Sequence, residues 1–101
     1  MRVIVFFDLP VETSAELREY TRFRKFLIKN GFVMMQESVY SKIILNNTAG
    51  EAVKENVRKN KTSKGLIQML TVTEKQFDAI EIIVGEKQNE MIDSDDRLVI
   101  I

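Results

Sequence analysis

The apolar pattern of the first thirty residues predicts a strand followed by a helix. Residues 3–7 form an unbroken β-branched and aromatic run, which is typical of a central strand buried on both faces. Thr13 and Glu16 have the spacing of a capping box, and Gly31 is well placed to end a helix. We therefore expect a helix from Thr13 to about residue 30. Its expected apolar face comprises Leu17, Tyr20, Phe23, Leu27 and Ile28.

Two further strands, a second helix and a fourth strand follow. Residues 32–45 are rich in strand formers, but they are too long for one strand of about five or six residues. The polar residues 36–38 therefore mark the turn of a hairpin. Residues Thr48 to Glu51 repeat the capping-box spacing and are expected to open a helix ending near Asn60. The apolar run at 66–72 predicts the fourth strand.

The order of these elements is βαββαβ, which predicts an α+β, ferredoxin-like fold. Such a fold has a four-stranded antiparallel sheet with two helices on one face. We assign residues 1–79 to this domain and residues 80–101 to a C-terminal extension. The extension contains short apolar runs at Ile80–Val84 and Arg97–Ile101. We expect both to extend the sheet of a second protomer or to dock a partner; the alternative is a tail folded back on its own sheet.

Composition narrows the possible chemistry. The 101 residues include no Cys and no His, which excludes thiol and imidazole catalysis, zinc sites and disulfides. A bound metal must be held by oxygen ligands, as Mg²⁺, Mn²⁺ or Ca²⁺ are. No apolar run approaches the roughly 20 residues of a membrane span, and no small-residue cleavage site follows the first strand. We therefore expect a cytoplasmic protein that does not bind membranes.

The net charge of zero conceals an asymmetry along the chain. Residues 1–64 hold 12 Lys and Arg against 7 Asp and Glu, whereas residues 65–101 hold 3 against 8. Basic positions form a stripe on each helix, and we expect Arg22 and Lys25 to lack acidic partners. The stripes could follow a DNA backbone or could be solvated faces. They comprise Arg18, Arg22, Lys25 and Lys29 on the first helix, and Lys54, Arg58, Lys61 and Lys64 on and after the second.

Several short segments together resemble one family. They are Phe6-Phe7-Asp8-Leu9-Pro10, Phe23-Arg24-Lys25, Gln36-Glu37-Ser38-Val39-Tyr40, Gly65, Thr73-Glu74-Lys75-Gln76-Phe77 and Ile83-Val84-Gly85. In this order and spacing they resemble the CRISPR-associated protein two family, the small partner of the CRISPR spacer integrase. The resemblance implies a homodimer that acts in spacer acquisition. It also implies a scaffold role between two dimers of the integrase, CRISPR-associated protein one, which hold a DNA fragment.

The resemblance also implies a site. Asp8 corresponds to the family's metal ligand, for Mg²⁺ or Mn²⁺, and Tyr40 to a residue near it, in an endonuclease acting on RNA or double-stranded DNA. One carboxylate binds Mg²⁺ weakly, so we expect two Asp8 residues to share the ion across a dimer axis and the activity to be weak or vestigial. Met34 and Met35 replace an Arg of some RNA-cleaving relatives, which argues against RNA cleavage. The alternatives are a non-catalytic interaction module, in which Asp8 is structural, and a ferredoxin-like toxin ribonuclease.

Overall fold

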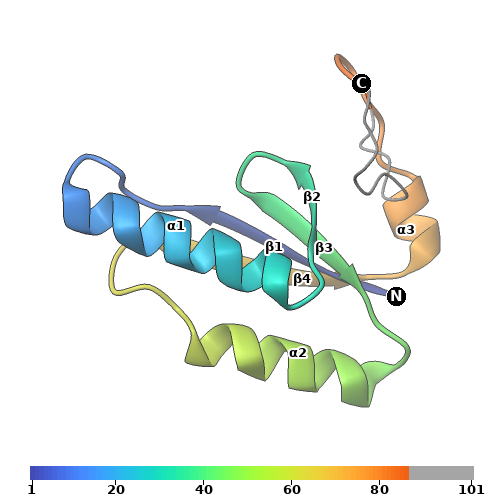
Figure 1. The fold of residues 1–101 in the computed structure, drawn as a ribbon. Helices are drawn as coiled ribbons and strands as arrows, with labels where there is room; N and C mark the ends of the chain where they lie inside the picture. The colour runs from blue at the N-terminus through green and yellow to red at the C-terminus, as the bar shows by residue number, and fades with distance from the viewer. Residues whose placement is uncertain (87–101) are drawn as a thin grey trace.

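The computed structural model describes residues 1–86 and shows a four-stranded antiparallel sheet of order β2-β3-β1-β4. Helices α1 and α2 lie against one face of this sheet (Figure 1). The predicted βαββαβ order is therefore confirmed, whereas the strand expected at 97–101 lies outside the described residues. The elements are β1 (Arg2–Asp8), α1 (Ser14–Lys29), β2 (Val33–Gln36), β3 (Val39–Ile43), α2 (Asn47–Lys59), β4 (Leu66–Val72) and α3 (Glu74–Asp78).

Strand β1 lies at the centre of the sheet, and its register defines the two faces. Val5 is opposite Tyr40 of β3 and Met69 of β4, so these side chains face the helices. Ile4 and Phe6 point to the other face and are only half-buried. Within the single chain, β1 is therefore fully covered on one face only, because the two long helices lie on that face. The core comprises Val3, Val5, Phe7, Leu9, Phe23, Leu27, Phe32, Tyr40, Ile44 and Val57.

The capping box predicted for α1 is present. The Thr13 hydroxyl accepts a hydrogen bond from the Glu16 backbone, and the Glu16 carboxylate accepts one from the Thr13 backbone, each at 3.1 Å. The predicted apolar face is too wide, however. Leu17 and Ile28 are 52% and 49% exposed, because the sheet contacts only the narrower stripe around Phe23 and Leu27.

Helix α2 begins earlier than the sequence spacing suggested. Its N-cap is Asn46, whose side-chain oxygen accepts a hydrogen bond from the Ala49 backbone at 2.8 Å. Asparagine is among the strongest N-cap residues, so it caps the helix before Thr48 is reached. Thr48 is already helical, and the predicted Thr48–Glu51 capping box is therefore wrong.

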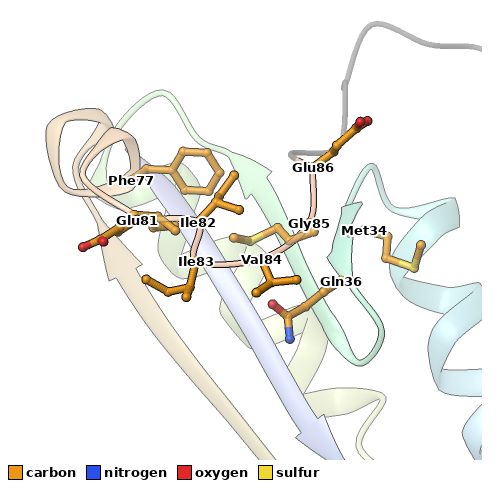
Figure 2. Close-up of a pocket in the computed structure, with 11 residues that line it drawn as sticks. Met34, Gln36, Phe77, Glu81, Ile82, Ile83, Val84, Gly85 and Glu86 are labelled. Carbon is orange, nitrogen blue, oxygen red and sulfur yellow. The ribbon is translucent and has the colours of Figure 1, made fainter.

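Helix α3 and the segment after it lie over the face that α1 and α2 leave open. The buried Phe77 packs beneath the Arg2 guanidinium, which lies 3.8 Å from the ring centroid. The segment then runs beside Gln36 of β2, where it helps to enclose a pocket of about 510 Å³ (Figure 2). Residues 80–84 form no strand within the described chain, and their pairing with a second protomer or a partner stays a prediction. Among residues 1–86, no helix is long and apolar enough to cross a membrane.

Candidate functional site

Asp8 is the last residue of β1, and it is exposed on the sheet face opposite α1 and α2. Its neighbour Leu9 is buried, which anchors the chain directly after the carboxylate. Across the sheet, β4 enters at Leu66, opposite Asp8. Gly65 precedes it with φ +92°, and a Cβ there would lie 2.7 Å from the Asp8 carbonyl oxygen. A glycine at position 65 therefore allows β4 to start close beside Asp8.

A hollow of about 220 Å³ lies beside Asp8. Its wall includes the turn between β2 and β3, which the antiparallel pairing brings to the end of β1. The Phe7 backbone N–H donates to the Ser38 carbonyl at 3.0 Å, and Ser38 has φ +66°. The residues that line the hollow are Phe6, Phe7, Asp8, Glu37, Ser38, Val39, Leu66 and Gln68.

Glu37 is the residue of this hollow that sequence reasoning missed, because it expected no second acid beside Asp8. The signal was available: antiparallel pairing of β1 with β3 places the start of β3 beside the end of β1. The polar residues that line the hollow are Asp8, Glu37, Ser38 and Gln68, whose side chains carry carboxylate, hydroxyl and amide oxygens. Oxygen donors are the ligands that Mg²⁺ and Mn²⁺ prefer, so the donor set fits such an ion. Within residues 1–86, no group of three acidic side chains could hold a metal.

Tyr40 does not line this hollow. It is 1% exposed on the helix face of the sheet, where its ring stacks on Phe7 with centroids 5.9 Å apart. Successive residues of a strand point to opposite faces, so Val39 reaches the hollow and Tyr40 points into the core. The expectation that Tyr40 lies beside Asp8 is therefore corrected: Tyr40 packs behind Phe7, one residue before the carboxylate.

The basic stripe on α1 divides into free and paired residues. Arg18, Lys25 and Lys29 are exposed and form no ion pair with any residue between 1 and 86. Arg22 differs, because its guanidinium binds the Glu19 carboxylate at 3.2 Å and also reaches the Asn60 carbonyl. The expectation that Arg22 has no acidic partner is wrong, since the i,i+3 spacing to Glu19 supports the pair.

The stripe on α2 is largely neutralised by its own helix. Glu51 binds Lys54 at 3.4 Å and Arg58 at 3.2 Å, and Glu55 binds Arg58 at 2.9 Å. Hydrogen bonds from Arg58 and then Lys54 lower the pKa of Glu51, which keeps these pairs charged. Lys64 lies 3.6 Å from Glu16. Of the four cations predicted here, Lys61 has no ion pair within the described chain.

The comparisons with known proteins concern the family and the fold. A family model described as CRISPR associated protein Cas2 matches residues 1–80. The chain belongs to the Cas2 family. A Cas2 of Treponema denticola, named CRISPR-associated endoribonuclease, is 52% identical over all 101 residues of both chains. A Streptococcus mutans Cas2 of the same name is 46% identical over the whole of this chain and 93% of its own.

A solved Cas2 supports the fold independently. The crystal structure of Streptococcus pyogenes Cas2 at pH 6.5 matches with a TM-score of 0.63, covering 83% of this chain and 100% of that one. The identity is 18%, so this likeness concerns the fold alone. The ferredoxin-like fold and the family resemblance predicted from the sequence are both confirmed.

Proposed function

We propose that this Cas2 family member acts in CRISPR spacer acquisition. In this role a homodimer binds double-stranded DNA as a scaffold for dimers of the spacer integrase in the cytoplasm. The same dimer carries a weak, metal-dependent endonuclease at Asp8. The observation that carries the proposal is the exposed Asp8 carboxylate, which lines a hollow together with Glu37, in a chain whose relatives are named endoribonucleases.

Asp8 and Glu37 are the groups that would hold Mg²⁺ or Mn²⁺. A divalent ion at this position supplies positive charge for the scissile phosphodiester and lowers the pKa of a coordinated water. The chain's own part is to hold the Asp8 carboxylate in place through the buried Leu9 and the close approach of Gly65. The described residues offer few ligands, which supports a slow enzyme and a site shared between two protomers.

The open face of the sheet supports the homodimer. Four large apolar side chains that the strand register places on this face are between 37% and 58% exposed: Val33, Ile43, Leu66 and Leu70. Asp8 lies on the same face. Packing two such faces together would bury apolar surface and would bring the two Asp8 carboxylates toward a common axis.

Cleavage assays test the catalytic part. Purified protein is expected to cut double-stranded DNA or RNA slowly with Mg²⁺ or Mn²⁺ and not with EDTA. Asp8→Asn should abolish cleavage, whereas Asp78→Asn, the same change at an exposed aspartate of α3, should leave it unchanged. Metal-independent cleavage of RNA alone would favour a toxin-like ribonuclease. Unaltered cleavage in Asp8→Asn would contradict the assigned site, and its absence in every variant would leave a non-catalytic module.

Association experiments test the scaffold part. The spacer integrase, CRISPR-associated protein one, should co-purify with this chain at micromolar concentration, and absence of binding would contradict the adaptation role. Removal of residues 97–101 should shift the dimer toward monomer or aggregate in sedimentation, because the four apolar residues at 98–101 are expected to pair with the partner's sheet. A truncated protein that remains dimeric with unchanged melting would refute that role of the tail.

A further inference from the structure

A second surface, on the opposite side of the sheet from Asp8, carries several charged side chains. It is a broad, open hollow of about 610 Å³ between α1 and the loop that follows α2. Three cations and one carboxylate line it, and none of the lining residues is aromatic. They are Glu19, Arg22, Lys59, Asn60, Lys61, Thr62 and Ser63. Lys59 was not among the residues of the two basic stripes expected from the sequence.

Arg22 holds this loop in place. Its Nη2 donates to the carbonyl oxygens of Asn60 at 3.2 Å and Lys61 at 3.3 Å, and Glu19 orients the same guanidinium. These carbonyls lie at the C-terminal end of α2, where the helix dipole is negative. By binding them, Arg22 neutralises the partial charges that would otherwise repel an incoming anion.

Lys59 and Lys61 are the exposed charges that remain available in the hollow. Neither forms an ion pair with any residue of the described range 1–86, in contrast to Lys54 and Arg58 of α2. The Thr62 hydroxyl donates to the Lys64 carbonyl at 2.8 Å, which closes the loop locally. Two unpaired ammonium groups therefore lie at the rim of a hollow whose carbonyls are already satisfied.

We infer that this hollow binds two backbone phosphates of double-stranded DNA, one at Lys59 and one at Lys61, with Arg22 as a positioning residue. The inference rests on the proposed DNA-binding function and locates it on the surface. Duplex DNA is favoured over single-stranded nucleic acid because no aromatic side chain is available in the hollow to stack on bases. Arg18, Lys25 and Lys29 on α1 provide further unpaired charge on the helix side.

The test measures duplex binding by fluorescence anisotropy across a salt series. Each phosphate contact adds about 0.9 to the slope of log affinity against log salt, so the Lys59→Gln/Lys61→Gln double variant should lose about 1.8 of slope and about tenfold in affinity at low salt. The matched control is Lys54→Gln/Arg58→Gln, which removes two cations that are already paired. Its slope should change by less than about 0.5.

A third variant tests the positioning role of Arg22. Arg22→Gln should weaken binding while lowering the slope by less than about 0.5, because the phosphate contacts themselves remain. Amide hydrogen exchange at residues 60–63 should accelerate in this variant. A slope loss near 0.9 with unchanged exchange would instead make Arg22 a direct phosphate contact and would overturn its assigned role.

The remaining outcomes separate this inference from the proposed function. If wild type binds the duplex but the Lys59/Lys61 variant keeps its slope, the hollow is wrongly assigned and DNA binding stands. Equal slope loss in the control pair also overturns the assignment, since it indicates a diffuse charge effect. If the wild-type protein binds no duplex at any salt concentration, both this inference and the proposed DNA binding are wrong. Tighter, Lys59/Lys61-dependent binding of single-stranded RNA would replace the duplex as the ligand.

Discussion

Arg2 at the start of β1 and Glu74 at the start of α3 form an ion pair that joins the first strand to the last helix of the described chain. The Arg2 Nε lies 3.1 Å from both Glu74 carboxylate oxygens, and the Met1 ammonium lies 3.5 Å from one of them. The same guanidinium covers Phe77. This contact fixes α3 against β1, and it thereby sets the point at which the segment 80–86 leaves the sheet.

Glu74→Gln should remove a pH-dependent part of the stability. Partial burial opposes ionisation of Glu74, but the hydrogen bonds and charges of Arg2 and the N-terminus outweigh it and lower the pKa below the ordinary 4.5. A lowered pKa gives stability that is present above pH 4.5 and is lost as pH falls through the folded-state value. Thermal melting should therefore show Glu74→Gln less stable than wild type at neutral pH, with the difference vanishing in acid. Glu81→Gln, at an exposed residue, is the control; an unchanged gap at low pH would contradict the prediction.

Gly65→Ala should be more destabilising than Gly85→Ala, although both glycines have positive φ. The left-handed backbone alone costs about 1–2 kcal/mol for an L-residue. At position 65 the new Cβ would also meet the Asp8 carbonyl oxygen at 2.7 Å, whereas nothing lies within 4 Å at position 85. We expect about 2–4 kcal/mol for Gly65→Ala and about 1 kcal/mol for Gly85→Ala in chemical denaturation. Equal losses would show that β4 does not enter as closely to Asp8 as described.

Tyr40→Phe distinguishes packing from chemistry at position 40. Because Tyr40 lies in the core behind Phe7, the phenylalanine variant should keep any metal-dependent cleavage within about twofold of wild type. Tyr40→Ala should lower the free energy of unfolding by about 3–5 kcal/mol, since it empties a large buried volume. Loss of cleavage in a stable Tyr40→Phe protein would instead show that the hydroxyl takes part in the reaction.

Ser41→Ala should stabilise the protein slightly. Ser41 is 1% exposed on β3, and its hydroxyl has no hydrogen-bond partner within the described residues. A buried hydroxyl without a partner costs about 1 kcal/mol or more, and alanine removes that cost with a small change in volume. An increase of about 1 kcal/mol in unfolding free energy is expected, measured with urea. A clear loss of stability would show that a second protomer or bound water satisfies this hydroxyl.

The sequence by itself determined the features that rest on local chemistry. The capping box of Thr13 and Glu16, the apolar run of β1 and the break at 36–38 are decided by residues within a few positions of one another. The order of elements then indicated the ferredoxin-like fold. The local pattern placed Asp8 at the end of a predicted strand, and the family resemblance singled it out as a candidate metal ligand.

Only the tertiary structure decided which distant residues share a surface. Strand pairing brings Glu37 to the hollow beside Asp8, and helix packing brings the Asn60 carbonyl to Arg22, 38 residues away. The pleat of β3 turns Tyr40 into the core. The run 80–84 has strand-forming side chains but no neighbouring strand in the described chain, and a strand needs a partner for its backbone hydrogen bonds. The local sequence pattern therefore determines the helices and strands, whereas long-range strand pairing and helix packing determine which charged groups and oxygen ligands lie close together.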